Sequence, residues 1–412
     1  MLFLSYYGPE EAASGIRAGR LARACSLDGQ SVRLVHGASD EGAYTWRDGV
    51  QAWTFARPSI IEGGGRVRSR PRREPTQHHS RGYLWRAAKA FAHAIIQPDA
   101  GILSARRFAR VGVRVGTDGP VAAPPIVVAS GPPWSTVLTG ASVATALRTR
   151  LVLDLQDLWS SNPVAKWPPL GKERAFRWEG RALREAAGVV FVNGLVAQGY
   201  DRAWTFLRES RRAVIPIGFD GPAPTRMSIE RHARLIIGHF GSLYRDRDFG
   251  VLLDVCASLT GRGMPVSVRW YGDILGDHPM RPMLEKHIAQ GTLQLSERVP
   301  HHLVRDLMQE CDLLLVVPSP QYREELTTKL YDYLDAGRPI LGLAHSGSLL
   351  EAFLAQARVG RTFSPDDATS LTSFLASCIT RGASFEPNHE FLQGQRTESL
   401  GRSMVELLGR LT

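Results

Sequence analysis

Short apolar stretches of strand length alternate with stretches of helical periodicity along this chain, break off at residues 216–224, and then start again. Alternation of this kind is typical of parallel sheets covered by helices on both faces. The break contains three prolines and two glycines, a composition that favours a linker. The sequence therefore predicts an α/β protein with two Rossmann-like halves.

The length of 412 residues agrees with this division, because it suits two domains of about 200 residues each. We expect the first domain at residues 1–218 and the second at residues 222–394. In the first we expect strands at 1–6, 31–36, 125–129, 151–155 and 187–192, helices at 15–25, 83–96 and 174–185, and a loop at 63–77. In the second we expect strands at 235–240, 266–271, 292–295, 312–317 and 339–344, and helices at 249–259, 283–289, 303–309 and 328–336.

No run of about 18 apolar residues is present, so no membrane-spanning helix is expected. The first residues lack the basic start and long apolar stretch of a signal peptide. We therefore expect a cytoplasmic protein.

The net charge of +10 is concentrated in one block. Between Arg66 and Arg114 the chain has twelve Lys or Arg but only two acids, Glu74 and Asp99. Such a block indicates an anionic partner, either phospholipid headgroups or nucleic acid. An ordinary solvated basic surface is the alternative.

One loop leads from the expected strand at 312–317 into the helix that starts near Thr328. Free backbone N–H groups and the helix dipole favour an anion at such a start, and Lys329 adds a full positive charge. Asp332 lies one turn further on the same side, where a carboxylate can accept hydrogen bonds from ribose hydroxyls. The sequence predicts a phosphate site here; the alternative is an ordinary helix start with Thr327 or Thr328 as the N-cap.

Glu324 and Asp332 are separated by seven residues, and Ala336–Ile340 reads Ala-Gly-Arg-Pro-Ile. This segment resembles the E-x7-E motif, with its following A-G-[KR]-P-[IV] turn, of the retaining GT-B glycosyltransferases (family 4-like) that include sucrose synthase-like and bacterial polysaccharide enzymes. The second acid is Asp where the family has Glu, and Glu325 competes with Glu324 for the first position.

Further segments resemble the same family in the same order. Gly238–Leu243 is similar to its glycine loop, with Gly241 and Ser242 approaching the diphosphate. Arg245 and Arg247 are the candidates for the basic residue after the loop, with Arg247 at the better distance. Ile215–Asp220 resembles the domain junction. The segment 293–300 resembles the strand and turn that meet the nucleotide base, near Arg298 and Val299.

The amino-terminal half resembles the bacterial polysaccharide branch of this family. Tyr6–Glu10 and Ser130–Pro133 look like an acceptor-side loop and a strand end, and Asp154–Trp159 looks like a D-x-R-D-x-W segment with Gln156 in place of Arg. Asp157 is the candidate for holding the acceptor or sugar, with a helix cap as the alternative. The other acceptor-side candidates are Ser14, Gly15, Arg17, Asp154 and Gln156.

The resemblance implies a GT-B fold, with two Rossmann-like domains facing a central cleft and residues 395–412 returning to the first domain. It also implies transfer of a sugar from a nucleotide-diphosphate donor to a saccharide or lipid-linked acceptor, with retention of configuration. Arg247, Lys329 and the helix start would stabilise the leaving diphosphate, and Glu324 would orient the sugar. No cofactor is expected.

We expect no metal, since Asp246 and Asp248 read as a surface pair beside the glycine loop rather than as metal ligands. We expect the acceptor to be membrane-linked, because the basic block lies in the acceptor-side domain. Two other functions stay open. One is a nucleotide-sugar epimerase or hydrolase of the same fold, and the other is a non-catalytic nucleic-acid-binding protein, although the sequence has no recognised nucleic-acid motif.

Overall fold

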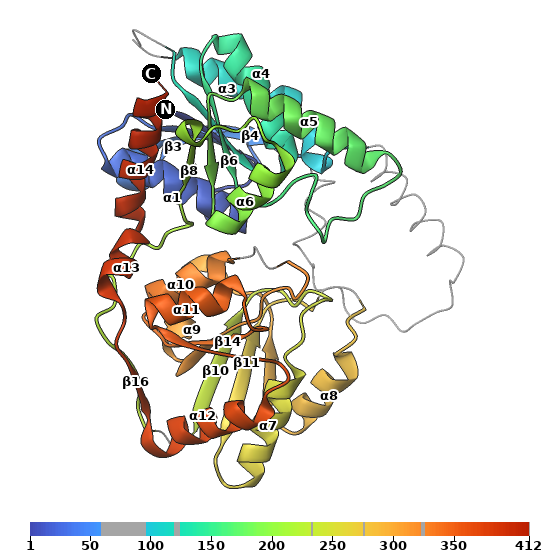
Figure 1. The fold of residues 1–412 in the computed structure, drawn as a ribbon, viewed down its shortest axis with the longest axis vertical. Coiled ribbons are helices and arrows are strands. Elements are labelled where there is room, and N and C mark those ends of the chain that lie inside the picture. Colours follow the sequence, from blue (N-terminus) through green and yellow to red (C-terminus); the bar gives the residue numbers. More distant parts are fainter. Residues whose placement is uncertain (59–95, 119–123, 232–233, 275–276, 323–325, 412) are drawn as a thin grey trace. The chain divides into compact units, whose positions relative to one another are not determined.

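The computed structural model describes residues 1–58, 96–118, 124–231, 234–274, 277–322 and 326–411. They form two compact units (Figure 1). Unit 1 comprises Met1–Pro216 and Leu400–Thr412, and unit 2 comprises Ile217–Ser399. Each unit has its own sheet and its own core.

The described strands of unit 1 form one sheet in the order β3-β4-β2-β1-β5-β6-β7-β8. The β3–β4 pair is antiparallel and the other neighbouring pairs are parallel. The strands are β1 (Leu2–Ser5), β2 (Arg33–Ala38), β3 (Gly42–Thr45), β4 (Gln51–Ala56), β5 (Val127–Gly131), β6 (Leu151–Leu155), β7 (Gly188–Phe191) and β8 (Arg212–Val214). The α-helices are α1 (Ala13–Leu27), α3 (Ala105–Thr117), α4 (Trp134–Leu147), α5 (Gly171–Glu185), α6 (Gly194–Ala203) and α14 (Thr397–Arg410), with short 3₁₀ turns between some elements.

Helix α14 completes the core of unit 1 from the far end of the chain. Its apolar residues Leu400, Met404, Leu407 and Leu408 recur at helical spacing and are at most 9% exposed. They pack in one cluster with residues of β1, β2, β5, β6 and β7. Unit 1 is therefore built from two segments that are distant in the sequence.

The main sheet of unit 2 is parallel throughout, in the order β12-β11-β10-β13-β14-β15. Its strands are β10 (Leu235–Phe240), β11 (Val266–Tyr271), β12 (Leu293–Ser296), β13 (Leu313–Val316), β14 (Ile340–Leu343) and β15 (Gly360–Phe363), and a separate antiparallel pair consists of β9 (Met227–Ile229) and β16 (Ala383–Phe385). Its helices are α7 (Gly250–Gly261), α8 (Arg281–Ala289), α9 (His301–Gln309), α10 (Thr328–Ala336), α11 (Leu349–Ala357), α12 (Ala368–Arg381) and α13 (His389–Gly394).

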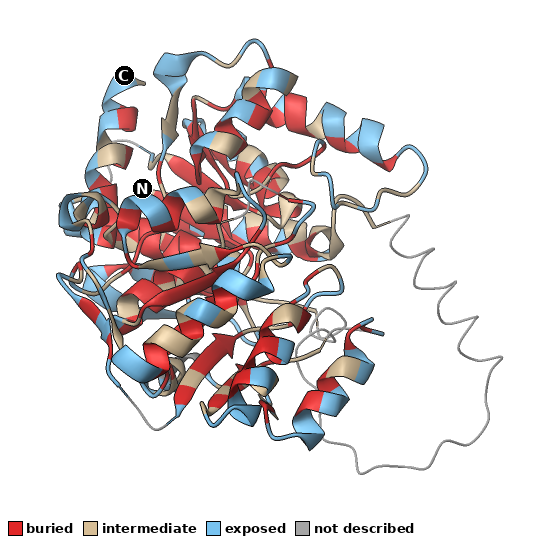
Figure 2. Ribbon diagram, turned by 60° about the horizontal axis from the view of Figure 1, so that its bottom comes forward, coloured by how far each residue is buried: buried red, intermediate tan, exposed pale blue. Residues whose placement is uncertain are grey.

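The buried residues lie on the strands and on the sheet-facing sides of the helices (Figure 2). In unit 2 a stack of rings fills the space under α7: His239 lies 3.8 Å from Trp270, and Trp270 lies 4.6 Å from Phe249, measured between ring centroids. This packing fixes β10 and β11 against the helix that follows the glycine loop.

Each sheet has a point where the chain order reverses direction, between β1 and β5 in unit 1 and between β10 and β13 in unit 2. In open parallel sheets, ligands bind beyond the carboxyl ends of the strands at such a point. The loops after β10 and β13 are those in which the sequence predicts a phosphate site.

The predicted α/β class is confirmed, and β6, β10, β11 and α10 begin and end at the predicted residues. The sequence interpretation missed β3, β4, α3 and α4 among others. The predicted loop at 63–77 and almost all of the predicted helix at 83–96 lie outside the described residues. Within the described parts of the chain, no helix is both long and apolar enough to cross a membrane.

Candidate functional site

The centre of the candidate site is the contact between Gly241, directly after β10, and Lys329, in the first turn of α10. Gly241 has φ +138°, and a Cβ placed on it would lie 2.1 Å from Cε of Lys329 and 2.8 Å from Nζ. Only glycine leaves this space open. Gly272, after β11, packs as closely, since its Cβ would lie 2.4 Å from the carbonyl oxygen of Gly241. The two glycines let the loop and the lysine come together.

The start of α10 favours an anion. Thr327 is its N-cap, and the structure shows no capping hydrogen bond from this side chain within the described residues. The Thr327 hydroxyl is buried and has no partner among those residues. The first N–H groups of a helix and its dipole attract negative charge. The helix start and the Lys329 amine therefore make a cationic corner beside Gly241.

Arg247 and Lys329 both act on a buried histidine at the end of β10. His239 is 1% exposed, and its Nδ1 lies 2.8 Å from the carbonyl oxygen of Leu315 on β13, so a neutral ring donates from Nδ1. Burial lowers the pKa of His239 well below its usual range, and the charges of Lys329 and Arg247 lower it further. Arg247 is 7% exposed and its guanidinium lies 4.9 Å from the ring centroid of Tyr244. Two cations from different elements are thus close enough to this strand end to affect the buried ring.

Tyr333 fixes α10 to that strand end. Its hydroxyl accepts a hydrogen bond of 3.0 Å from the backbone N–H of Phe240, the last residue of β10. Tyr333 is fully buried, and burial raises its pKa far above the usual value, so the hydroxyl stays neutral. Because Tyr333 lies one turn after Lys329, this bond holds the lysine at the height of Gly241.

The predicted donor residues do not all gather at this corner. The structure brings together Gly241, Arg247, Thr327, Thr328 and Lys329, with Asp332 half-buried one turn along α10. Ser242 is half-buried, Arg245 and Arg298 are exposed, and Val299 is half-buried. Arg298 and Val299 follow β12, which is separated from β10 by β11. Glu324 and Glu325 lie outside the described residues.

Asp246 and Asp248, on either side of Arg247, have structural partners. The Ser319 hydroxyl donates to Asp246 at 2.5 Å, which ties the loop after β10 to the loop after β13. The backbone N–H of Gly250 donates to Asp248 at 2.7 Å, at the start of α7. Across the described residues, no group of three or more His, Cys, Asp or Glu is arranged to hold a metal ion.

The predicted acceptor-side residues of unit 1 also lie together, around the ends of β5 and β6. Arg17 and Asp154 form an ion pair of 2.8 Å in which both side chains are fully buried. Arg17 also donates to the carbonyl oxygen of Pro216, and Asp154 accepts from Ser130 at 2.5 Å. Because these groups are paired with each other, they position the surrounding loops.

Gln156 completes this cluster. Its amide donates to the Ser130 hydroxyl at 2.9 Å and to the backbone oxygen of Ser14 at 3.3 Å. A Cβ on Gly15 would lie 2.0 Å from the oxygen of Gly8, so α1 starts in close contact with the loop after β1. Asp157 is half-buried, and its backbone oxygen accepts from the Tyr200 hydroxyl at 3.3 Å.

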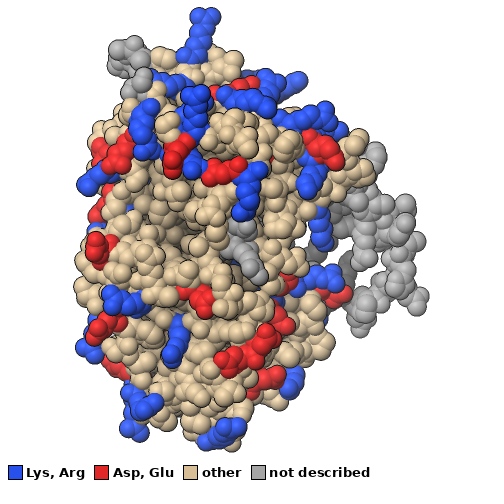
Figure 3. Space-filling model, in the orientation of Figure 1, with Lys and Arg blue, Asp and Glu red and all other residues tan. Residues whose placement is uncertain are grey.

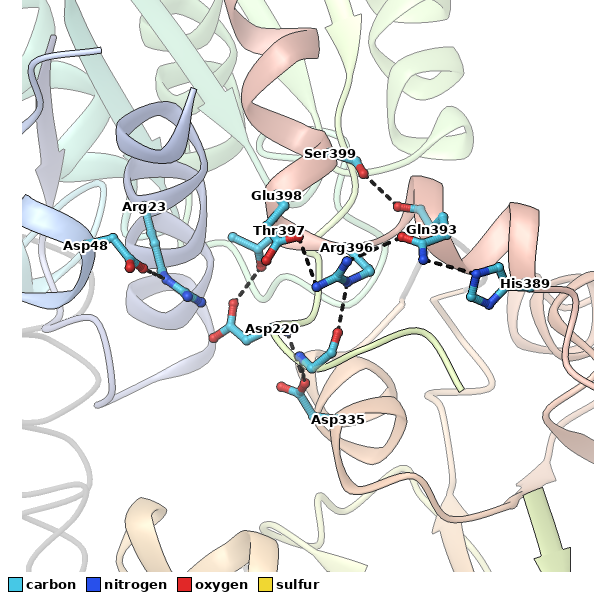
Figure 4. A network of polar contacts seen from close by, with 11 residues as sticks. Arg23, Asp48, Asp220, Asp335, His389, Gln393, Arg396, Thr397, Glu398 and Ser399 are labelled. Carbon is cyan, nitrogen blue, oxygen red and sulfur yellow. Dashed lines mark hydrogen bonds and ion pairs between the residues drawn. The ribbon is translucent and has the colours of Figure 1, made fainter. Parts of the chain in front are cut away.

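The carboxyl end of α10 carries a second polar cluster, drawn in Figure 4. Asp335 accepts hydrogen bonds from the backbone N–H groups of Asp220, at 3.0 Å, and of Gly221. Arg396 donates to the oxygen of Gly221 at 3.0 Å, and Thr397 donates to Asp220 at 2.7 Å. The first and last segments of unit 2 are therefore hydrogen-bonded to each other, and the first is also hydrogen-bonded to α10, the helix that carries Lys329.

No protein-family model matches this sequence, and no curated protein matches it either. Solved structures do. Sucrose-phosphate synthase from Thermosynechococcus elongatus matches with a TM-score of 0.60 and 12% identity, over 100% of this chain and 93% of that chain. Anabaena HepE, solved with UDP and glucose, matches with a TM-score of 0.56 and 15% identity, over 100% and 96%. This chain has the GT-B fold.

A third structure agrees with this assignment. The lipopolysaccharide outer core galactosyltransferase WaaB matches with a TM-score of 0.55 and 10% identity, over 99% of this chain and 98% of that chain. The predicted GT-B fold is thus confirmed by matches that span nearly the whole length of each protein. Within this GT-B chain, the Gly241–Lys329 corner lies at the point of strand reversal in unit 2, and the Arg17–Asp154 cluster lies near that of unit 1.

Proposed function

We propose that the chain is a glycosyltransferase of the hexosyltransferase type, which takes a sugar from a nucleotide-diphosphate donor. The observation that carries the proposal is that Lys329 and the start of α10 lie beside Gly241, with Arg247 near enough to lower the pKa of the neighbouring His239. A diphosphate leaves more readily when its developing charge is stabilised by fixed cations and N–H groups. This corner supplies both.

The same residues support a reaction in which cations of the protein take the place of a metal ion. Lys329 and Arg247 would neutralise the diphosphate, and Asp332 would accept hydrogen bonds from the ribose. An acceptor hydroxyl would attack the sugar from the face that the diphosphate leaves, which retains the configuration and requires no nucleophile from the protein. Glu324 would orient the sugar, and Asp157 would hold the acceptor.

UDP is the first nucleotide to test, because HepE was solved with UDP and glucose. We expect Lys329→Ala to weaken UDP binding by about 1–3 kcal/mol, the range for a lost charge-assisted hydrogen bond. Isothermal titration calorimetry measures this, with GDP, ADP and dTDP as further ligands. Lys286→Ala is the matched control, since Lys286 is on α8, outside the corner, in the same unit. Equal weakening by both variants, or binding that requires magnesium, would contradict the proposed site.

The acceptor in this proposal is a lipid-linked saccharide at an anionic membrane surface on the cytoplasmic side. Arg106, Arg107, Arg110 and Arg114 of the basic block are exposed on α3, and Lys and Arg gather over unit 1 in the view of Figure 3. Each such residue contributes roughly 1 kcal/mol near an anionic bilayer. We expect co-sedimentation with anionic but not neutral vesicles at low salt, weakened when these four arginines become Ser. Equal behaviour toward both vesicle types would favour a soluble acceptor.

An epimerase or hydrolase of the same fold is the second candidate, because the donor corner would serve it equally well. Chromatography of the products separates the two. A transferase releases nucleotide in proportion to acceptor added, whereas a hydrolase or epimerase converts the donor without an acceptor. Salt-sensitive binding of RNA or DNA that nucleotides do not displace would instead favour the nucleic-acid-binding alternative.

A further inference from the structure

Unit 2 contains a cavity of about 380 Å³ at the carboxyl ends of β13, β14 and β15. Its wall includes Asp246 and Asp248 of the loop after β10, Ser319 of the loop after β13, Ser348 at the start of α11, and Asp366 after β15. Small-molecule sites usually measure about 300–1,000 Å³, so this cavity suits a ligand of roughly monosaccharide size.

The cavity adjoins the donor corner through a single short loop. The Arg247 guanidinium in this loop lies over the Tyr244 ring and its charge lowers the pKa of His239, whereas its neighbours Asp246 and Asp248 line the cavity. Asp246 is held there by the Ser319 hydroxyl at 2.5 Å. A ligand with its diphosphate at Lys329 would therefore have the cavity beside it, on the β14 and β15 side of the sheet.

The lining has the chemistry of a sugar site. Carboxylates and hydroxyls offer strong hydrogen bonds to sugar hydroxyls, and proline rings offer flat apolar surface to the C–H faces of a pyranose. Three aspartates line the cavity, and none of the lining residues that the structure describes is Lys or Arg. The acids are not gathered as a metal-ligand set in the described residues. The wall therefore favours a neutral or amino-bearing sugar ring and disfavours a sugar ring that carries a carboxylate.

We propose that this cavity holds the transferred sugar of the donor, and that Asp246, Asp248 and Asp366 select neutral or amino sugars against uronic acids. The proposal rests on the proposed function, because it takes the diphosphate to lie at Lys329. It adds to that function a binding site for the sugar and an explanation of which sugar charges the site accepts.

The test compares UDP, UDP-glucose and UDP-glucuronate by isothermal titration calorimetry at pH 8. We expect the intact protein to bind UDP-glucose more tightly than UDP-glucuronate. Asp366→Lys should reduce this preference roughly three- to tenfold, the effect of one reversed charge at short range, and Asp366→Asn should have a smaller effect. Asp366 is exposed at the rim, so both variants are expected to fold.

Glu285→Lys is the matched control, because Glu285 is exposed on α8 and does not line the cavity. It reverses the same charge in the same unit and should leave the preference for UDP-glucose unchanged. If UDP itself fails to bind, the proposed function fails. If UDP binds but both sugars bind equally, or Asp366→Lys leaves their ratio unchanged, the sugar assignment is overturned and the donor corner stands.

Discussion

At the scale of single residues, the candidate site depends on His239, a side chain that never touches solvent. Its ring lies between Trp270 and β13, donates to the oxygen of Leu315, and faces the charges of Lys329 and Arg247. A protonated imidazole here would add a third cation in a buried space. The ring therefore stays neutral in the folded protein at pH values where an exposed histidine is charged.

This makes the stability of unit 2 depend on pH. In the unfolded chain this histidine takes up a proton near pH 6.5, whereas in the folded protein it does not. His239 therefore has no effect on the free energy of unfolding above about pH 7.5, and it lowers that free energy increasingly as the pH falls below 6.5. We expect the wild type to lose about 1 kcal/mol more than His239→Asn between pH 7.5 and 5.5. Asparagine can still donate to Leu315. The measurement is urea-dependent hydrogen exchange of β10 peptides, and equal losses in both proteins would show that His239 titrates normally.

At the scale of elements, one strand and one helix together position the residues of the donor corner. Gly241 directly follows β10, and Lys329 lies on α10. The hydrogen bond from the Phe240 N–H to the Tyr333 hydroxyl fixes the position of α10 along β10, and thereby the position of Lys329 relative to Gly241. If this bond is lost, the N–H remains buried without an acceptor, which ordinarily costs about 1–3 kcal/mol.

Tyr333→Phe should therefore destabilise unit 2 by about 1–3 kcal/mol and weaken UDP binding, although Tyr333 does not face the ligand. Thermal unfolding and calorimetry measure the two effects. Tyr244→Phe serves as the control, because Tyr244 is 48% exposed and phenylalanine keeps the ring beside Arg247. Normal UDP affinity in Tyr333→Phe would mean that α10 is held in place by its other contacts.

The sequence predicts β10 and α10 to the residue because each is a clear apolar or amphipathic pattern with glycine or threonine at its boundary. Helix α4 was not predicted because its sequence, WSTVLTGASVATAL, contains five β-branched residues and a glycine, which have low helix propensity. Gly241 and Lys329 were predicted as site residues from their motifs, and the structure places them in contact. His239 and Tyr333 were missed, because their roles depend on β10 and β13 being neighbours, which the local pattern does not specify.

At the scale of the whole molecule, the two units differ in how the chain builds them. Unit 2 is one continuous segment, whereas unit 1 needs residues 400–412 to complete its core. Burying four apolar side chains contributes roughly 6–12 kcal/mol, which is comparable to the entire stability of a domain.

Removal of residues 400–412 should therefore unfold unit 1 and leave unit 2 able to bind UDP. In the same way, a protein consisting of residues 217–399 should fold alone and bind UDP as the full chain does, because every described residue of the donor corner lies within it. Calorimetric scanning shows which transition is lost, and UDP titration reports the site. Loss of UDP binding in both truncated proteins would mean that unit 2 requires unit 1.

The close approach of Gly241 and Lys329 has a consequence for the entropy of binding. The lysine stem packs against the backbone of Gly241, in the space that a Cβ at position 241 would fill, and Lys329 is half-buried before a ligand arrives. An unrestrained lysine loses up to about 2 kcal/mol of side-chain entropy when it is immobilised. A stem that is packed in this way gives up part of that entropy on folding, which lowers the entropic cost of binding a diphosphate.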